Sequence, residues 1–426
     1  MIPAPHGGSL VDRQLPAIAA QRREAELQDL PKLRPDLGQV YDALQIATGA
    51  FSPLEGFMDR GTLESVVLTG RLPDGLPWPI PVYLSPPGPA NERTVQAVAP
   101  GDEIAILDPS DRLVAILHLT EKFRLPKREI EQHVYNTSDA THPDVAALSS
   151  TGDLALAGRI DLVRSPLVPL PQYELTPATT RATFRANGWD SVAGYQTRNV
   201  PHLGHEHLQR MTLEREDVDA LLIHPVVGPL KDGDYRPEIV IAAYQSLIGR
   251  YYPSDRVALA TLSIAMRYAG PRAALFLAIV RQNFGCSHFI VGRDQAGVGR
   301  FYDPYACHRI FDEFPLDILP IRFREFAYCR ACQGMVSDRT CGHPKDERIS
   351  TSQTKVRRAL LDHQPLPVEI LRPEVAEILR HNDVLRRGEP RYDRPAPDPD
   401  PARPAWTPPR RAVGRASSTR EFAALG

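Results

Sequence analysis

Apolar residues occur in short runs separated by turn residues over the first part of the chain. The runs 79–84 and 104–109 predict strands, because short apolar runs bounded by Gly, Pro and Asp are typical of β-structure. A third run, 112–119, follows the second after a short polar turn, which predicts a hairpin. One helix is expected before these strands, near 38–48. The pattern therefore predicts a β-rich N-terminal domain over residues 1–165.

The pattern changes from about residue 188, where strands alternate with longer helical segments. The expected elements, in chain order, are a strand at 191–196, a helix at 204–215, a strand at 219–224, a helix from Pro271 through the buried apolar run 273–280, and a strand at 287–291. Such alternation is typical of βαβ units around a parallel sheet. We therefore predict an α/β fold with a central parallel-sheet domain over residues 166–325 and a small C-terminal region at 326–387.

Proline is concentrated near the C-terminus, where eight of the 20 residues from Pro390 to Pro409 are proline. Such a segment has too few large apolar side chains to build a core. We therefore expect the folded part to end near Arg387. Residues 388–426 are expected to form a disordered, linker-like tail with a short helix at 419–425, and an interaction peptide is the alternative.

Composition limits the classes of partner. The chain has 50 basic and 52 acidic side chains and a formal net charge of −2, so anion binding must come from local clusters. The sequence has no apolar run of about 18 residues and no basic-then-apolar start of a secretory signal. We therefore expect no nucleic acid and no membrane as partner, and a cytoplasmic location.

The segment from Gln196 to His205, after the first strand of the α/β pattern, holds two imidazoles, a guanidinium and two amides. Ligands bind outside the carboxyl ends of parallel strands, and a helix N-terminus favours anions. A helix that begins at Pro201 would place His202 and His205 on one face, where both can donate to phosphoryl oxygens. Phosphate is the expected ligand. A solvated loop with a helix-capping histidine, or a zinc site, is the alternative.

This segment resembles the signature of the ATP sulfurylase (sulfate adenylyltransferase) family. Further stretches that resemble the family are 49–58, Gly270-Pro271-Arg272, Gly292-Arg293-Asp294 with Ala296-Gly297, and Thr354-Lys355-Val356-Arg357. The resemblance spans about residues 35 to 380. It implies a PUA-like fold for the N-terminal domain and a Rossmann-like nucleotidyltransferase fold for the central domain.

The resemblance also implies the reaction. A sulfate oxygen would attack the α-phosphorus of ATP and pyrophosphate would leave, which gives adenosine 5′-phosphosulfate. It implies that sulfate is held by Gln196, Arg198 and the backbone amide of Ala296. It implies that the catalytic residues are Thr197, Arg198 and Asn199. It implies that ATP lies along Gln196, Thr197, Arg198 and Asn199 and along Gly292, Arg293, Asp294 and Gln295.

Physical chemistry supports this arrangement, because two anions must be brought together against their mutual repulsion. Arg198 can contact both anions. Sulfate is already deprotonated at neutral pH, so no general base is required. His202 and His205 are suited as catalytic residues to neutralise charge on the bridging and β-phosphate oxygens as pyrophosphate leaves, and Mg²⁺ bound with ATP would help.

Two positions depart from the family pattern. Gln295 stands where the family usually has histidine, so a side-chain role there is open although a backbone contact would survive. Gln353 stands where the family has glycine. Lys355 and Arg357 near it are candidates for phosphate contacts, and an amphipathic helix start capped by Ser352 or Thr354 explains them equally well.

Cysteines cluster in the C-terminal region as Cys329-x₂-Cys332-x₈-Cys341-x-His343. Zinc prefers four N or S ligands in a tetrahedron, and a Cys-x₂-Cys turn supplies two of them. We therefore predict a closed structural zinc site with Cys329, Cys332, Cys341 and His343 as ligands, and unliganded reduced cysteines are the alternative. Cys286 and Cys307 are expected to pack as small apolar residues.

Other functions are also open at this point. PUA-like domains and zinc knuckles occur in RNA-binding proteins, although the near-zero net charge argues against that function. A nucleotidyltransferase with a different acceptor is the second alternative. The chain contains no Gly-x₄-Gly-Lys-Ser/Thr segment of the kind a fused kinase would need. We expect a homo-oligomer.

Overall fold

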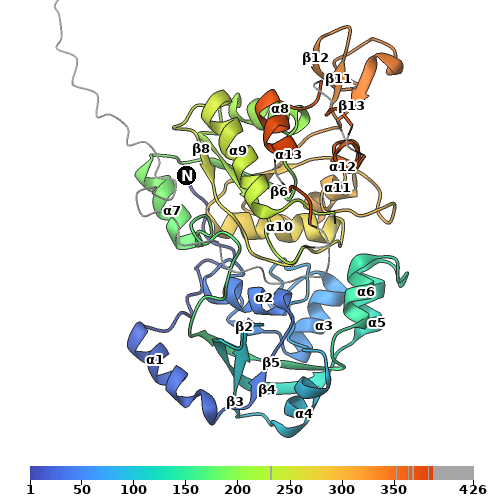
Figure 1. The fold of residues 1–426 in the computed structure, drawn as a ribbon. Helices are drawn as coiled ribbons and strands as arrows, with labels where there is room; N and C mark the ends of the chain where they lie inside the picture. Colours follow the sequence, from blue (N-terminus) through green and yellow to red (C-terminus); the bar gives the residue numbers. More distant parts are fainter. Residues whose placement is uncertain (231–232, 352, 363, 367–368, 382, 387–426) are drawn as a thin grey trace, which may run out of the picture.

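The computed structural model describes residues 1–230, 233–351, 353–362, 364–366, 369–381 and 383–386. Figure 1 shows an N-terminal domain, a central domain stacked on it, and a small group of strands that projects from the central domain. The proline-rich tail and the helix expected at 419–425 lie outside the described residues. In the described part of the chain, no helix is long and apolar enough to cross a membrane.

The N-terminal domain is built on a five-stranded sheet with strand order β1-β3-β4-β5-β2. Its strands are β1 (Lys32–Leu33), β2 (Gly56–Phe57), β3 (Glu103–Leu107), β4 (Leu113–Arg124) and β5 (Leu154–Leu162). The predicted hairpin is confirmed, because β3 and β4 pair antiparallel from Glu103↔His118 to Leu107↔Leu113. Asp108 forms the turn, since its carboxylate accepts from the backbone N–H of Ser110 at 2.8 Å and of Arg112 at 3.1 Å.

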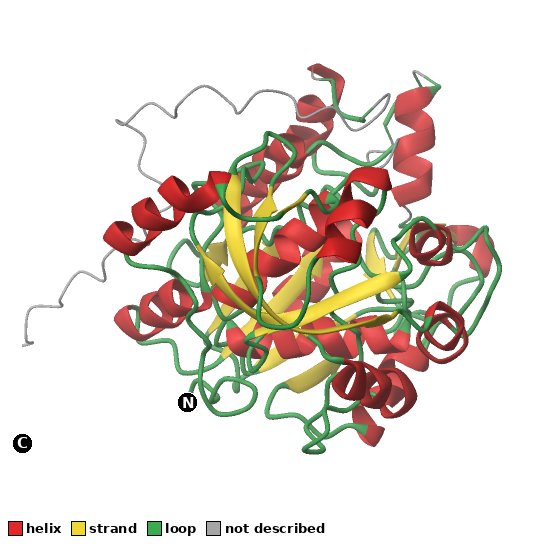
Figure 2. Cartoon of the chain, turned by 90° about the horizontal axis from the view of Figure 1, so that it is seen from below, coloured by secondary structure: helices red, strands yellow, loops and turns green. Residues whose placement is uncertain are grey.

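Helices flank this sheet in larger number than the pattern predicts (Figure 2). They are α1 (Ala17–Ala25), η1 (Glu26–Gln28), α2 (Leu37–Ala47), α3 (Arg60–Thr69), α4 (Pro89–Ala97), α5 (Lys127–Ile130), the π-helical turn η2 (Glu131–Tyr135) and α6 (Pro143–Ser149). The helix expected near 38–48 is confirmed as α2, which begins after Asp36 because that carboxylate caps the N–H of Gln39. The strand expected at 79–84 is wrong: Pro79 and Pro81 cannot donate to a ladder, and only Leu84 forms a bridge, to Leu156.

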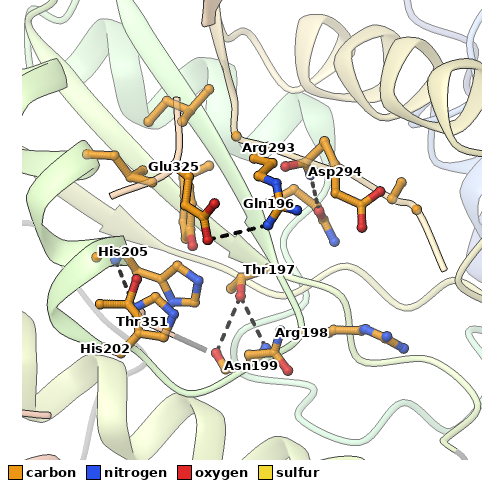
Figure 3. A pocket seen from close by; sticks show the side chains of 18 of the residues that line it. Gln196, Thr197, Arg198, Asn199, His202, His205, Arg293, Asp294, Glu325 and Thr351 are labelled. Carbon is orange, nitrogen blue, oxygen red and sulfur yellow. Dashed lines mark hydrogen bonds and ion pairs between the residues drawn. The ribbon is translucent and has the colours of Figure 1, made fainter. Parts of the chain in front are cut away.

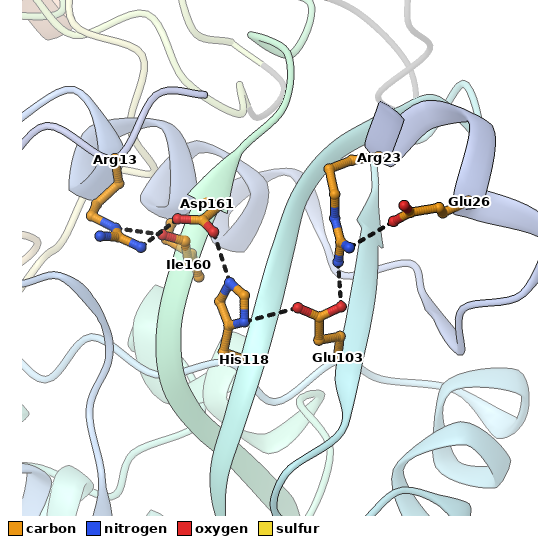
Figure 4. Close-up of polar contacts among 7 residues, drawn as sticks. All are labelled: Arg13, Arg23, Glu26, Glu103, His118, Ile160 and Asp161. Atoms are coloured by element: carbon orange, nitrogen blue, oxygen red, sulfur yellow. Dashed lines mark hydrogen bonds and ion pairs between the residues drawn. The ribbon is translucent and has the colours of Figure 1, made fainter. Parts of the chain in front are cut away.

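A polar network joins three strands of this sheet (Figure 4). The ring of His118 on β4 lies 2.8 Å from a carboxylate oxygen of Asp161 on β5 and 3.2 Å from one of Glu103 on β3. Arg13 pairs with Asp161, and Arg23 on α1 pairs with Glu103. These ion pairs fasten the first part of the chain onto the sheet.

The central domain contains a five-stranded parallel sheet with strand order β10-β9-β6-β7-β8, which confirms the predicted α/β fold. Its strands are β6 (Val192–Thr197), β7 (Ala220–Pro225), β8 (Val257–Leu259), β9 (His288–Val291) and β10 (Leu319–Arg322). Its helices are α7 (Pro177–Ala186), α8 (Leu203–Leu213), α9 (Pro237–Tyr251), α10 (Pro271–Asn283) and α11 (Ala306–Glu313). The strand order reverses between β6 and β9. Loops that follow the two strands at such a switch point diverge and leave a crevice.

Helix α10 lies between the two domains, as Figure 1 shows. All residues from Ala273 to Asn283 are buried, as the sequence pattern predicts. The ring of Phe276 lies 5.2 Å from that of Phe51 and 5.7 Å from that of Trp78, both in the N-terminal domain. The run from Ala273 to Val280 is apolar on all sides because it packs on the parallel sheet and on the N-terminal domain at once. The two domains therefore share one core.

The C-terminal region begins with a three-stranded antiparallel sheet of order β12-β11-β13. Its elements are β11 (Ala327–Cys329), β12 (Gly334–Val336), η3 (Lys345–Glu347), β13 (Arg348–Ser350), α12 (Gln353–Leu361) and α13 (Pro373–His381). Helix α13 packs against α9, and α12 brings Gln353 to the loop after β6, where its side-chain amide donates to the carbonyl of Val200 at 2.7 Å. The C-terminal region therefore helps to fix that loop.

Candidate active site and metal centre

The loop after β6 ends at the N-terminus of α8, as the sequence predicts. His202 is the N-cap residue of this helix, and its Nδ1 accepts from the backbone N–H of His205 at 3.2 Å. The imidazole rings of the two histidines stack, with centroids 3.7 Å apart and planes 18° from parallel. Because Nδ1 of His202 is an acceptor, its Nε2 carries the proton and remains available as a donor.

Both histidines are neutral in the free protein. Burial lowers the pKa of His202 to about 4. Burial, together with the nearby His202, holds the pKa of His205 well below its usual range. Each ring therefore offers one N–H near pH 7. A polyphosphate beside them would favour the charged form and would raise both pKa values.

The loop after β9 approaches from the other side of the switch point. Asp294 and Ala296 have positive φ values of 54° and 59°, and the backbone N–H of Asp294 donates to the carbonyl of Pro304 at 2.7 Å. A side chain at Gly297 would collide with Asp294, because a Cβ there would lie 1.9 Å from its Oδ1. The loop is tight at this point, so a larger residue at Gly297 would require the carboxylate of Asp294 to move.

The two loops are joined by a hydrogen bond in which the side-chain amide of Gln295 donates to Oε1 of Gln196 at 2.5 Å. Gln295 therefore does have a side-chain contact in this chain. It orients the amide of Gln196, which lies at the end of β6 and is buried. The link crosses the reversal in strand order.

These loops enclose a cavity of about 320 Å³ (Figure 3). Every residue predicted for catalysis, sulfate and ATP lines it: Gln196, Thr197, Arg198, Asn199, His202, His205, Gly292, Arg293, Asp294, Gln295 and Ala296. The structure thus brings together two groups of side chains that lie far apart in the sequence. The cavity is lined mainly by polar and basic groups, and this lining suits an anion.

Sequence reasoning missed part of this lining, namely Met266, Tyr268, Arg324, Glu325, Phe326 and Thr351. Glu325 follows β10 and lies 3.4 Å from Nη1 of Arg293. Tyr268 follows β8. Each segment follows a short apolar run that forms a strand of the parallel sheet, which ends three residues before Glu325 and nine residues before Tyr268.

Arg198 lies at one side of the cavity (Figure 3), where its guanidinium donates to the hydroxyl of Tyr268 and stacks on the ring, with Cζ 4.9 Å from the centroid. A carboxylate oxygen of Asp234 lies 3.8 Å from the guanidinium. Arg357 on α12 donates to Oδ1 of Asn199 at 2.8 Å, whereas Lys355 is exposed. The guanidinium groups of Arg198 and Arg357 are therefore held in place by hydrogen bonds and an ion pair.

The predicted metal ligands come together in the C-terminal sheet. The ligand atoms of Cys329, Cys332, Cys341 and His343 all lie within 4.8 Å of one another. The Sγ atom of Cys341 lies 3.8 Å from that of Cys332 and 3.7 Å from that of Cys329, and Nδ1 of His343 lies 3.2 to 3.6 Å from the three sulfurs. Zn–S bonds of about 2.3 Å in a tetrahedron place two sulfurs about 3.8 Å apart. The four residues therefore fit a tetrahedral metal ion.

The short spacing between Cys341 and His343 is compatible with this geometry because both residues lie in the irregular segment before β13. Arg348 donates to the carbonyls of both residues and so fixes that segment. Cys286 and Cys307 are buried away from the cluster, as expected for residues that pack as small apolar groups.

Comparisons with known proteins identify related chains. A family model described as ATP-sulfurylase matches residues 171–382, and one described as PUA-like domain matches residues 3–165. A sulfate adenylyltransferase of Hyperthermus butylicus is 42% identical over 391 residues, which cover 91% of this chain and 99% of the relative. One of Staphylothermus marinus is 45% identical over 383 residues, which cover 89% of this chain and 98% of the relative.

The chain belongs to the ATP-sulfurylase family. A solved structure titled hexameric APS kinase from Thiobacillus denitrificans is also similar, with a TM-score of 0.68 and 25% identity over 89% of this chain and 68% of that chain. Membership of the ATP-sulfurylase family makes the chain a nucleotidyltransferase and is consistent with sulfate adenylyltransferase activity. It disfavours the RNA-binding alternative and the transferase with another acceptor.

Proposed function

We propose that ATP and sulfate react in the cavity between the loops after β6 and β9. A sulfate oxygen forms a bond to the α-phosphorus while the bond from that phosphorus to the bridging oxygen breaks. The products are adenosine 5′-phosphosulfate and pyrophosphate, and the reaction is reversible. The observation that carries this proposal is the convergence of both predicted loops on a single cavity in a member of the ATP-sulfurylase family.

Sulfate is placed between Gln196, Arg198 and the backbone amide of Ala296, which line the same cavity. The positive φ of Ala296 directs this part of the loop into a turn where backbone N–H groups can meet an anion. The side-chain amide of Gln295 orients that of Gln196 through their hydrogen bond. Fixed donors of this kind lower the repulsion between sulfate and ATP and need no reorganisation during the reaction.

ATP is placed along Gln196 to Asn199 and along Gly292 to Gln295, with its phosphates toward His202 and His205. The Nε2–H of His202 and the N–H of His205 would donate to the bridging and β-phosphate oxygens as charge develops there. Because both rings are neutral before ATP binds, the free protein does not have to bury an unpaired positive charge at this place. Thr197 and Asn199 support the loop, since the N–H of Asn199 donates to Oγ1 of Thr197 at 3.1 Å.

Mg²⁺ bound to the polyphosphate would supply further neutralisation of the leaving group. We propose that Mg²⁺ enters as its complex with ATP, because magnesium is usually bound by substrate phosphates together with only one or two carboxylates.

The cluster of Cys329, Cys332, Cys341 and His343 is proposed to hold a structural Zn²⁺. The support is its three thiolates and one imidazole at tetrahedral spacing, a donor set that zinc prefers. Free thiols in such a site require a reducing compartment, which favours the cytoplasm. Metal analysis of the purified protein should give one zinc per chain.

The solved structure of similar fold is titled hexameric. On this basis we propose that the chain forms a homo-oligomer. Light scattering of the purified chain should give a mass of several protomers, and a monomer at micromolar concentration would contradict the proposal.

The proposed reaction is tested by exchange of labelled pyrophosphate into ATP, run with and without sulfate, and by ATP formation from adenosine 5′-phosphosulfate and pyrophosphate. We expect exchange only with sulfate, because the transfer is direct and no adenylylated enzyme forms. Exchange of equal rate without sulfate, or with an unrelated acceptor in its place, would contradict the proposal.

A further inference from the structure

Tyr268 lies on the segment between β8 and α10 and lines the cavity. Its hydroxyl accepts a hydrogen bond from Nη1 of Arg198, and its ring lies under the same guanidinium at 4.9 Å from Cζ. No motif identified in the sequence includes this tyrosine. Its two contacts nevertheless fix both the direction and the plane of the Arg198 side chain.

The backbone of Tyr268 is held by the N-terminal domain. Its N–H donates to Oδ2 of Asp144 at 2.7 Å, and its carbonyl lies 3.0 Å from Nε2 of His142. Both residues lie at the start of α6. Nδ1 of His142 accepts from the N–H of Asp144 at 3.2 Å, so Nε2 carries the proton and donates to Tyr268. The N-terminal domain therefore hydrogen-bonds both the backbone N–H and the backbone C=O of Tyr268.

The His142 side chain is itself held in place by buried aromatic rings. His142 is completely buried and packs on the rings of Tyr135, Phe301 and Tyr302. The Tyr302 hydroxyl lies 3.1 Å from Nε2 of His142 and donates to the carbonyl of Tyr135 at 3.0 Å. The contacts to Tyr268 thus belong to a packed junction between the domains and not to a mobile surface.

An arginine side chain loses rotamer entropy when it is fixed, and an arginine that must meet two anions gains from being held beforehand. Arg198 is 26% exposed, so solvent and substrate can reach it. We propose that Tyr268 is a positioning residue for Arg198, and that His142 and Asp144 give the N-terminal domain a part in catalysis by fixing Tyr268. This inference rests on the proposed function.

The first test is Tyr268→Phe, which removes the hydroxyl and keeps the ring. A hydrogen bond to a charged group is lost, so kcat/KM for sulfate should fall about tenfold, through a higher KM and a lower kcat, with Tm within about 2 °C of the wild type. Tyr173→Phe is the matched control, since its hydroxyl bonds Gln245 outside the cavity, and it should leave both constants unchanged. Unchanged kinetics in Tyr268→Phe would overturn the proposal.

The second test removes the support that the N-terminal domain gives to Tyr268. Asp144→Ala removes the acceptor for the N–H of Tyr268 and should lower kcat/KM for sulfate about fivefold, whereas Asp144→Asn keeps an acceptor oxygen and should restore most of it. In the double variant with Tyr268→Phe, the losses should fall short of the product of the single losses, because both changes act through one tyrosine. Losses that multiply fully would overturn the role of the N-terminal domain.

The same assays distinguish this proposal from the proposed function. If wild-type protein shows no sulfate-dependent exchange, the function is wrong. If the wild type is active and Tyr268→Phe equals it, only the positioning role is wrong.

Discussion

The cavity that we propose as the active site and the Cys/His cluster differ in how their side chains are gathered. The cavity takes residues from the ends of several parallel strands, leaves open volume between them, and keeps two histidines buried and neutral. The cluster takes four ligand atoms from one short segment and closes them on one another. From this difference we expect that removal of a side chain from the cavity lowers catalytic activity and leaves the free energy of unfolding unchanged. Removal of a ligand from the cluster should lower the free energy of unfolding and leave the activity of the folded protein unchanged.

The largest effect is expected for Arg198→Ala, which removes the donors shared by both anions. We expect kcat/KM to fall about a thousandfold, which is the typical cost of removing a donor that stabilises charge in the transition state. The Tm should be unchanged. Arg215→Ala is a control, because that arginine forms an exposed pair with Asp217. Normal activity in Arg198→Ala would break the assignment of the cavity.

A substitution in the Cys/His cluster should lower stability and leave activity almost unchanged. Cys332→Ser should lower the free energy of unfolding by about 3 kcal/mol or more, since metal binding contributes directly to folding, while kcat of the folded protein stays within about twofold. Cys286→Ala is the control, and it should keep the full metal content because this cysteine lies outside the cluster. A loss of kcat without loss of stability in Cys332→Ser would show that the cluster takes part in chemistry.

His205→Ala sharpens the comparison within the cavity. It should lower kcat about a hundredfold with little change in KM, because the charge it stabilises develops as pyrophosphate leaves. His133→Ala is the control, since His133 is exposed in the N-terminal domain and does not line the cavity. An unchanged kcat in His205→Ala would argue against the leaving-group role.

The smallest effect is a pH dependence of stability. The pKa of His202 is about 4 in the folded protein and about 6.5 when unfolded, so the unfolded chain binds more protons as the pH falls and stability is lost from about pH 6.5 downward. The loss from this residue between pH 7.5 and pH 5 is about 2 kcal/mol. His202→Asn keeps a capping oxygen for α8 and should make the urea-unfolding profile shallower by that amount. A profile identical to the wild type would mean that His202 is not buried as a neutral ring.

The sequence predicts those parts of the fold in which local pattern and tertiary role agree. Strands β6 and β9 and the loops after them are examples, because an apolar run is followed directly by chemistry-bearing residues. The helix α10, with its wholly apolar run 273–280, was also predicted as buried. The strand predicted at 79–84 was wrong because a short apolar run resembles a strand, while Pro79 and Pro81 lack the N–H groups that pairing needs.

Other parts of the site depend on long-range packing that no local pattern reveals. Tyr268 reaches Arg198 because His142 and Asp144 hold its backbone from a different domain. Glu325 reaches Arg293 because β10 pairs beside β9. The sequence contains the apolar runs before both residues, but the order of the strands that brings them to the cavity is set only by the assembled sheet.

The most direct measurement is a crystal structure of the protein with adenosine 5′-phosphosulfate and without pyrophosphate, so that the ligand cannot react to form ATP. The sulfate group should lie against Arg198, Gln196 and the backbone amide of Ala296, with the nucleotide along Gly292 to Gln295. Ligand bound at another place, with this cavity filled only by solvent, would contradict the account.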